Sequence, residues 1–135
     1  MLITGASAGL GLELARLFAA DGAALVLVAR NESKLATLAG ILRKDFEVDV
    51  RIIPADLTKP NAVEDLLNAL LEAEIGIRIL INNAGFGAYG PVLDHDWDVY
   101  RRMIDLNVTA LTGLARGLLP GMVACAENGC KPVNI

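Results

Sequence analysis

Short aliphatic runs alternate with helical patterns along the whole chain, and this alternation is the feature that most restricts its fold. Runs typical of strands occupy residues 2–4, 24–29, 48–53 and 77–82, and another begins at 133. Between them, apolar residues recur at spacings of three and four, the pattern of an amphipathic helix. Such repeats fold as a parallel sheet with helices on both faces. The sequence therefore predicts an α/β fold, a Rossmann-type doubly wound parallel sheet.

Specific residues limit the helices between these runs. Asp21-Gly22 ends the first helix, and Asn31 is placed to cap the second. Asn61 and Glu64 have the spacing of an N-cap and its N3 partner at the start of the third. The apolar faces of the first two helices are expected at Leu10, Leu14, Leu17 and Phe18, and at Leu35, Leu38, Ile41 and Leu42.

Two further features concern an edge of the sheet and the last helix. The run at 48–53 alternates between apolar and polar residues, which indicates a strand near a sheet edge. A long helix is predicted from about Asp96 to Ala126. A bend is expected near Pro120, because proline removes a helix hydrogen bond.

Composition excludes several classes of protein. Hydrophobic residues make up 54% of the 135-residue chain, too many for a disordered segment but suitable for strands buried on both faces. The net charge of −4 does not favour nucleic acid or an anionic membrane. The longest purely apolar run, Ala23 to Ala29, is far shorter than the roughly 18 residues of a membrane helix. No basic segment precedes the first strand, so we expect no signal peptide and a cytoplasmic protein.

The cysteines and the single histidine do not suggest a metal site. Structural zinc needs four nitrogen or sulfur ligands, whereas the chain offers Cys125, Cys130 and His95. We expect both cysteines to be free thiols in a reducing compartment. His95 is expected to be a solvated residue where the long helix begins, not a catalytic group.

A glycine-rich turn separates the first strand from the first helix. It reads TGASAGLG, with glycines at positions 5, 9 and 11. Glycine allows a positive φ and lets backbone approach a phosphate closely, and the helix that follows presents unpaired N–H groups to it. No Gly-Lys-Ser/Thr follows, so this is not a P-loop. The turn predicts a site for the pyrophosphate of a dinucleotide.

The end of the second strand bears on which dinucleotide is bound. In dinucleotide folds an acid here bonds the adenosine ribose, whereas an arginine accommodates a 2′-phosphate. This chain has Ala29 and Arg30 at that position. A guanidinium can bind a phosphate through two hydrogen bonds, so the sequence favours NADP(H) over NAD(H). The alternative is a solvated arginine at the start of a helix.

The third and fourth strands also end in polar residues. Asp56 could accept a hydrogen bond from the adenine amino group, with Leu57 packing on the ring. Alternatively, Asp56 only caps the next turn. The fourth strand ends in Asn82-Asn83-Ala84-Gly85, whose small residues leave room for a ribose or nicotinamide. The alternative for this segment is a plain turn.

Together these features resemble the short-chain dehydrogenase/reductase family. The matches are TGASAGLG for the family's TGxxxGxG, Asp56-Leu57 for its adenine-site acid, NNAG at 82–85, and Asn107 in IDLNVTA for the asparagine of its catalytic tetrad. Their order and spacing agree over all 135 residues. The resemblance implies oxidoreductase activity on a small carbonyl or alcohol substrate, and a homo-oligomer associating through the long helix.

The resemblance also implies individual roles. Thr4 would brace the glycine turn formed by Gly5, Gly9 and Gly11. The remaining cofactor contacts would come from Ser7, Leu10, Arg30, Asp56, Leu57, Asn83, Ala84 and Gly85. Asn107 would bend the long helix locally, so that a freed main-chain carbonyl holds a water of the proton relay. Its alternative role is that of a polar residue on a helix surface.

The chain departs from the family pattern in its catalytic residues. The family uses a tyrosine, a lysine four residues after it, and a serine. Four residues after Tyr89 is Leu93, and four after Tyr100 is Ile104. The only serines are at positions 7 and 33, both on the cofactor side.

We therefore expect residues 1–135 to be an incomplete NAD(P)-binding Rossmann domain, cut within or just after its fifth strand. The catalytic part would be missing, and the chain alone would be inactive. The alternative is a non-catalytic NAD(P)-binding module or a truncated gene product.

Overall fold

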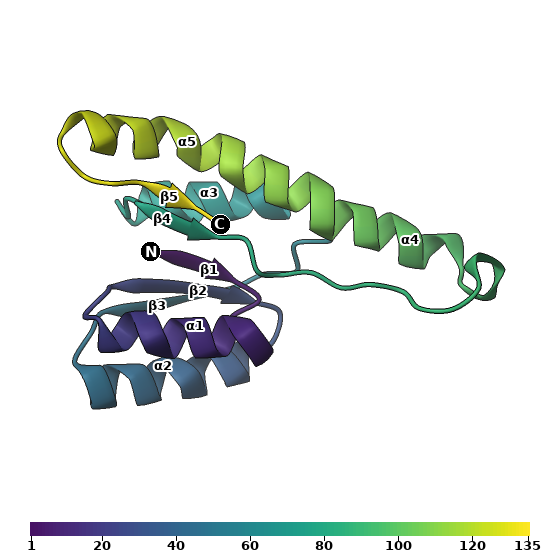
Figure 1. The fold of residues 1–135 in the computed structure, drawn as a ribbon, viewed down its shortest axis with the longest axis horizontal. Helices are drawn as coiled ribbons and strands as arrows, with labels where there is room; N and C mark the ends of the chain where they lie inside the picture. The colour runs from purple at the N-terminus through teal and green to yellow at the C-terminus, as the bar shows by residue number, and fades with distance from the viewer.

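The computed structural model describes residues 1–135 and contains one five-stranded parallel sheet. Its strands are β1 (Leu2–Thr4), β2 (Leu25–Ala29), β3 (Val50–Pro54), β4 (Ile79–Ile81) and β5 (Val133–Asn134). Their spatial order is β3-β2-β1-β4-β5, and every neighbouring pair is parallel (Figure 1). All five predicted strands are present, and β3 lies at an edge, as its alternating sequence indicated.

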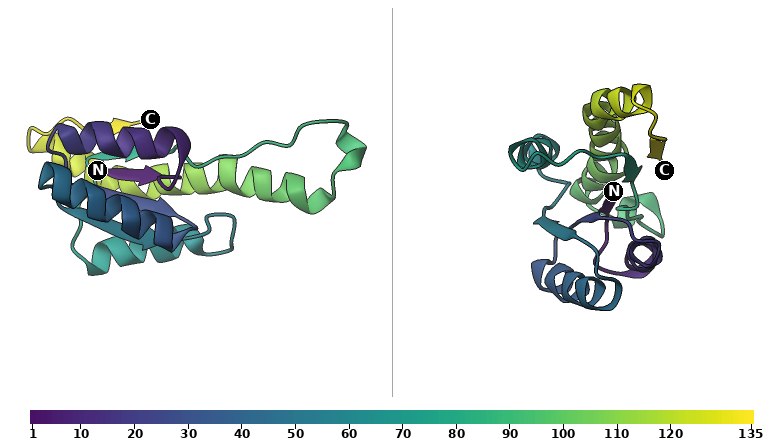
Figure 2. Two further views of the ribbon diagram at one scale, coloured as in Figure 1. Left: turned by 90° about the horizontal axis from the view of Figure 1, so that it is seen from below. Right: turned by 90° about the vertical axis from the view of Figure 1, so that its left-hand side faces the viewer.

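Helices cover both faces of this sheet, which confirms the doubly wound α/β fold. One face carries α1 (Gly9–Ala20) and α2 (Glu32–Phe46), and the other carries α3 (Ala62–Glu72) and the long C-terminal helix (Figures 1 and 2). Successive strand residues divide between two cores. Ile3 and Leu27 pack toward α1 and α2, whereas Leu2 and Val26 pack toward α3 and the long helix.

The buried face of α1 differs from the predicted one. Leu10 and Leu17 are 68% and 64% exposed, and α1 instead buries small residues at a spacing of four, namely Gly11, Ala15 and Ala19. The reason is close packing: a Cβ atom on Gly11 would lie 2.5 Å from the carbonyl oxygen of Gly5, so only glycine fits there. The prediction that leucines mark the buried face was wrong for Leu10 and Leu17.

The two predicted helix caps have different outcomes. The Asn31 side chain accepts a hydrogen bond from the Lys34 N–H at 2.9 Å, which confirms it as the cap of α2. Asn61 is at the N-cap position of α3, but it adopts a left-handed conformation with φ of 65° and its side chain makes no capping bond. The Asn61 side chain therefore does not accept the hydrogen bond from the Glu64 N–H that a capping box requires.

The long helix is continuous from Trp97 to Glu127 and has an irregular centre. It consists of α4 (Trp97–Ile104), the π-helical segment η2 (Asp105–Ala110) and α5 (Leu111–Glu127). A short 3-10 turn, η1 (Val92–Asp94), precedes it. The irregularity falls at η2, whereas α5 continues through Pro120. By length and composition alone this helix could cross a membrane, although its Ala110, Leu114 and Met122 are buried within the domain.

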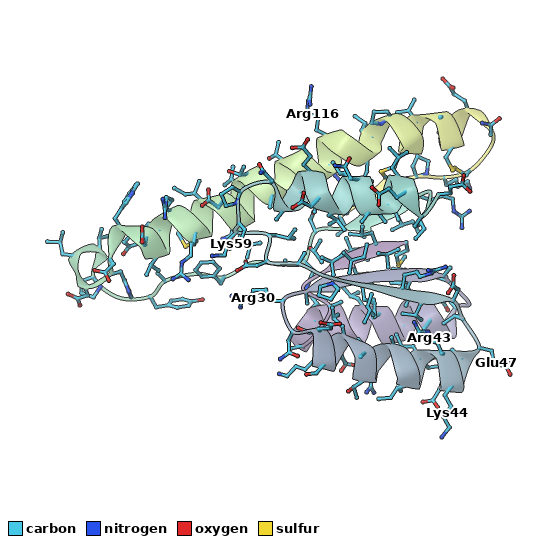
Figure 3. The ribbon with its side chains drawn as sticks, turned by 180° about the vertical axis from the view of Figure 1, so that it is seen from behind. Arg30, Arg43, Lys44, Glu47, Lys59 and Arg116 are labelled. Carbon is cyan, nitrogen blue, oxygen red and sulfur yellow. A yellow bond between two sulfur atoms is a disulfide. The ribbon has the colours of Figure 1, made fainter.

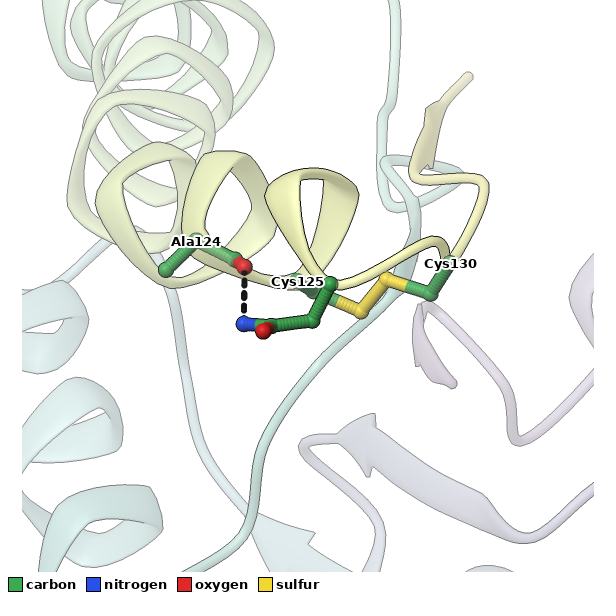
Figure 4. Close-up of a disulfide and its surroundings, with 4 residues drawn as sticks. Ala124, Cys125 and Cys130 are labelled. Carbon is green, nitrogen blue, oxygen red and sulfur yellow. Dashed lines mark hydrogen bonds between the residues drawn. A yellow bond between two sulfur atoms is a disulfide. The ribbon is translucent and has the colours of Figure 1, made fainter.

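The two cysteines form a disulfide, which corrects the expectation of free thiols. The Cα atoms of Cys125 and Cys130 lie 5.4 Å apart (Figure 4). Helix α5 ends at Glu127, and Gly129, with φ of 85°, turns the chain back. As a result, the Cys130 N–H donates to the Cys125 carbonyl at 3.1 Å, and the two side chains meet.

Candidate dinucleotide-binding site

The candidate site lies at the carboxyl edge of the sheet, where the strand order reverses. From β1 the chain proceeds through β2 to β3 on one side, and β4 then returns to the other side of β1. Ligands of open α/β sheets bind at such a switch point. A cavity of about 350 Å³ opens there between the loops that follow β1, β2, β3 and β4. Of the predicted site residues, it is lined by Gly5, Ser7, Arg30, Asp56, Leu57, Ala84 and Gly85.

The five other predicted cofactor residues, Thr4, Gly9, Leu10, Gly11 and Asn83, do not line this cavity. A larger cavity of about 580 Å³ lies between α3 and α4 and shares Leu57 and Thr58 with the first. It includes the carboxylates of Glu64 and Asp105 but no part of the glycine turn. We therefore place the candidate site at the smaller cavity, which gathers the strand ends.

The three glycines of the turn are required for different reasons. Gly5 has φ of 66°, and a Cβ atom there would lie 2.9 Å from the Ala84 Cα atom. Gly11 is equally crowded, because a Cβ atom there would lie 2.5 Å from the Gly5 carbonyl oxygen. Gly9 has φ of 56° but no atom within 4 Å of where its Cβ would be. The turn is thus closely packed at Gly5 and Gly11 and open at Gly9, where a phosphate could approach the first turn of α1.

Thr4 and Asn83 hold the glycine turn against β4. The buried Thr4 hydroxyl donates to the Ile81 carbonyl at 3.3 Å and accepts from the Ala84 N–H at 2.9 Å. The Asn83 side-chain amide donates to the carbonyls of Thr4 and Gly5 at 3.0 and 3.3 Å. The Thr4 hydroxyl therefore links the start of the glycine turn to β4 and to the segment after it. The Asn83 side chain supports the turn from behind.

Asp56 lines the same cavity from the segment after β3. Its Oδ1 atom accepts from the backbone N–H of Thr58 at 3.1 Å and from the Thr58 hydroxyl at 2.8 Å. Partial burial raises the pKa of Asp56, but these two hydrogen bonds and the charges of Arg30 and Lys59 outweigh it. The pKa of Asp56 is therefore below its ordinary value, and the side chain is a carboxylate at neutral pH. The Oδ1 atom thus caps the turn, which is the alternative role considered for Asp56. The Oδ2 atom makes no hydrogen bond within the chain.

Arg30 extends into solvent from the carboxyl edge of the sheet (Figure 3). Its neighbour Ala29 is buried and places no carboxylate beside it. Arg30 forms no ion pair, since the one pair in the structure joins Arg101 to Asp98. The guanidinium is free to bind an anion at the mouth of the cavity.

Asn107 lies in the π-helical segment η2, so the long helix is irregular at this residue. Its side chain makes two bonds to one residue of the loop after β4: it accepts from the Phe86 N–H at 3.2 Å and donates to the Phe86 carbonyl at 2.8 Å. Gly85 leaves the necessary space, because a Cβ there would lie 3.1 Å from the Asn107 Oδ1 atom. Asn107 thus fastens the loop to the helix from an exposed position on the helix surface.

Sequence reasoning missed several residues near the site. Phe86, Leu106, Lys34 and Thr58 also line the cavity. Phe86 directly follows the NNAG segment and Thr58 follows Asp56-Leu57, so proximity to those motifs could have indicated both. Leu106 and Lys34 lie on helices, and no local sequence signal identifies them.

A small aromatic cluster orders the loop before α4. The ring nitrogen Nε2 of His95 lies 2.8 Å from the Tyr89 carbonyl, and the Tyr100 hydroxyl donates to the Val92 carbonyl at 3.1 Å. The His95 and Tyr100 rings meet edge to face at 5.9 Å. His95 precedes α4 and is half-buried instead of fully solvated.

Comparison with known proteins identifies the class that this fold and site define. The family model for short chain dehydrogenases matches residues 1–135, so the chain belongs to that family. An uncharacterised oxidoreductase of Staphylococcus aureus is 34% identical over 122 residues, covering 90% of this chain and 52% of the relative. The chain thus spans about half the length of the curated relatives it matches first.

Solved structures agree with this assignment. A short-chain dehydrogenase from Sphingobium yanoikuyae in complex with NADPH is 41% identical, with a TM-score of 0.85 over 98% of this chain and 51% of that protein. L-sorbose reductase from Gluconobacter frateurii, solved with NADPH and L-sorbose, is 37% identical with a TM-score of 0.85 over 92% of this chain and 47% of the reductase.

Proposed function

We propose that residues 1–135 form one NAD(P)-binding domain that holds the cofactor of an oxidoreductase. The observation that carries the proposal is the glycine turn, which is closely packed against Ala84 at Gly5 and open at Gly9. This arrangement leaves the first N–H groups of α1 accessible to a pyrophosphate. When bound, the nicotinamide of the cofactor supplies or takes up a hydride.

Each predicted site residue has a role in this proposal. Gly5, Gly9 and Gly11 shape the turn, and Ser7 and the backbone of Leu10 bind the pyrophosphate. Asp56 accepts from the adenine amino group while Leu57 packs on the ring. Ala84 and Gly85, supported by Asn83 and Thr4, leave space for the ribose and nicotinamide.

NADP(H) is the proposed cofactor, in preference to NAD(H). Arg30 is free of intramolecular ion pairs, and buried Ala29 offers no carboxylate to repel a 2′-phosphate. The Sphingobium and Gluconobacter relatives were both solved with NADPH, which supports the proposal without deciding it for this chain.

The proposed reaction of the whole protein is hydride transfer between the nicotinamide and the carbon of a carbonyl or alcohol. In it, Asn107 positions the loop at Phe86 and organises the proton relay. The 135-residue chain alone is proposed to be inactive, because neither of its tyrosines is followed four residues later by a lysine. The same observation favours the second candidate, a nucleotide-binding module without catalysis.

The long helix is proposed to mediate homo-oligomerisation. Its exposed apolar residues include Trp97, Ile104, Val108, Leu119 and Val123. A stripe of this kind on a soluble protein marks an association surface. Sedimentation of the chain and of a Val108→Glu variant tests this: the variant should shift toward monomer, and unchanged sedimentation would contradict it.

A cytoplasmic location without membrane insertion is also proposed, in keeping with the family. Cell fractionation tests this point: the proposal expects the protein in the cytoplasmic fraction, and recovery of the protein with membranes would contradict it.

Binding and turnover are tested separately. NADPH oxidation is followed with ketones and aldehydes for this chain and for a version extended through the next in-frame Ser and Tyr-x-x-x-Lys. The proposal expects both to bind NADPH and only the extended version to turn over. Turnover by the 135-residue chain would show that the catalytic residues are misassigned, and NADPH binding without turnover in both would favour the binding module.

A further inference from the structure

The disulfide joins the end of α5 to the linker that leads into β5 (Figure 4). Cys125 lies in the last turn of α5, and Cys130 lies three residues before Val133, where β5 begins. The same turn is held by Asn128, whose side-chain amide donates to the Ala124 carbonyl at 2.8 Å. Both cysteines are half-buried, so part of each residue remains accessible to a small reagent. The covalent link therefore fixes the approach to β5 and can be reached from solvent.

Few other contacts hold β5. Val133 and Ile135 are 40% and 66% exposed, and neither belongs to either of the two cores. The Val133 N–H donates to the Arg78 carbonyl at 3.0 Å. The Ile135 N–H donates to the Leu80 carbonyl at 2.9 Å, and both bonds attach β5 to the β4 segment. Because a strand with few buried apolar contacts opens at a low free-energy cost, the disulfide has a large share in keeping β5 on the sheet.

β5 is in turn bonded to the segment that forms the candidate site. The Asn82 N–H donates to the Ile135 carbonyl at 2.7 Å, and the Asn82 side-chain amide donates to the Asn134 Oδ1 atom at 3.3 Å. The next residue, Asn83, donates to the Gly5 carbonyl at 3.3 Å. Displacement of β5 removes the two bonds that position Asn82 next to Asn83. A series of contacts thus leads from the disulfide through β5 and Asn82 to the glycine turn.

We propose that Cys125 and Cys130 form a redox-modification site that controls cofactor binding. The disulfide holds β5, and with it Asn82 and the glycine turn, in the geometry that binds NADPH. Reduction to two thiols frees β5 and weakens that binding. This redox control rests on the proposed binding of the cofactor. It also fits the proposed cytoplasmic location, because disulfides of cytosolic proteins are usually transient and either catalytic or redox-sensing.

Thiol–disulfide exchange interconverts the two forms. Cys125 lines a cavity of about 390 Å³ between α3 and α5, which gives a small thiol access to this residue. A thiolate of a cellular dithiol attacks the Cys125 sulfur, the bond between the cysteines breaks, and Cys130 leaves as a thiolate that takes up a proton. The second thiol of the reductant then displaces Cys125 from the mixed disulfide. The protein gains two electrons and two protons while the reductant becomes a disulfide, and a small disulfide oxidant reverses both steps.

The test compares NADPH binding by the 135-residue chain in its two redox states. Calorimetric titration of the oxidised chain and of the chain in dithiothreitol should show that reduction weakens NADPH roughly 3- to 10-fold, a fraction of the constraint that a short disulfide loop imposes. Removal of the dithiothreitol and addition of oxidised glutathione should restore the original affinity. Hydrogen exchange should rise on reduction at Asn82 and Ala84, but not at Leu27, because β2 does not contact β5 in the sheet.

A double variant removes the redox-modification site. Cys125→Ser/Cys130→Ser should bind NADPH as the reduced chain does and should respond to neither reagent. Ala126→Ser is the matched control, since it adds a hydroxyl at an exposed position of the same helical turn and keeps both cysteines. It should show the redox response of the unmodified chain.

The outcomes distinguish the redox control from the proposed function. Equal NADPH affinity in the two redox states would show that the redox control is wrong while the proposed function stands. No NADPH binding in either state would contradict both. A rise in hydrogen exchange at Leu27 as large as that at Asn82 would identify general destabilisation and would also contradict the redox control.

Discussion

The Thr4 hydroxyl accepts a hydrogen bond from the Ala84 N–H at 2.9 Å and so joins two motifs that lie 80 residues apart in the sequence. Thr4 opens the glycine turn, and Ala84 belongs to the NNAG segment. Because β1 and β4 are neighbours in the sheet, this one hydroxyl fixes both sides of the candidate site. Its loss should therefore affect stability and the geometry of the site together.

Thr4→Val is expected to lower the free energy of unfolding by about 1–3 kcal/mol, because it keeps the side-chain shape but leaves the Ala84 N–H without its partner. Urea denaturation measures the change. Thr112→Val, at an exposed position of α5, is the control and should change stability by less than about 0.5 kcal/mol. Equal stabilities of the two variants would show that the Thr4 bond is unimportant.

Substitutions of the glycines should distinguish effects on stability from effects on NADPH binding. Gly9→Ala should fold, at a cost of about 1–2 kcal/mol for a left-handed alanine, but should bind NADPH weakly because its methyl group points into the open space. Gly5→Ala should be far less stable, since its methyl group meets backbone. Gly40→Ala, in α2 with open space and no positive φ, should be slightly stabilising. Thermal unfolding and NADPH titration distinguish the three, and normal NADPH binding by Gly9→Ala would contradict the proposed phosphate position.

Asp56 should contribute to stability in a pH-dependent way. Its pKa is lowered in the folded chain, so the contribution is present above the ordinary pKa of about 3.9 and is lost as pH falls through the lowered value. The free energy of unfolding should decline as pH falls below about 4, and less steeply in Asp56→Asn. Identical slopes for the two proteins would contradict a role for Asp56.

The disulfide should fasten β5 to the end of α5. Closing so short a loop is worth about 2 kcal/mol in the chain-entropy model. Reduction with dithiothreitol should lower the free energy of unfolding by about that amount and increase hydrogen exchange at Ile135, whose N–H bonds to Leu80. A Cys125→Ser/Cys130→Ser variant should already show both effects and should not respond to the reductant. A response of that variant would mean that the reductant acts elsewhere.

Much of the fold could be predicted because its signals are local. Strands buried on both faces read as aliphatic runs, and glycines and helix caps mark where they end, so the five strands and the switch point followed from the sequence. The buried face of α1 could not be predicted from leucine spacing, because it depends on how closely α1 approaches Gly5 and Asn83. The same applies to the disulfide, which depends on the turn at Gly129.

The candidate site was predictable where motifs follow strand ends and not where helices supply side chains. Arg30 directly follows β2, Asp56 and Gly85 lie within four residues of the ends of β3 and β4, and all three line the cavity. Lys34 reaches the site from a helix, and its position depends on the packing of α1 against α2. The two bonds between Asn107 and Phe86 span 21 residues and depend on the path of the loop after β4.

Calorimetric titration of this chain and of Arg30→Ala with NADPH and NADH tests the central claim most directly. Arg116, exposed on α5 and far from the site, supplies the control Arg116→Ala (Figure 3). The account predicts that the chain prefers NADPH, and that Arg30→Ala weakens NADPH roughly 10- to 150-fold while NADH binding and the Arg116→Ala variant are unaffected. Equal affinity of the unmodified chain for NADPH and NADH would contradict it.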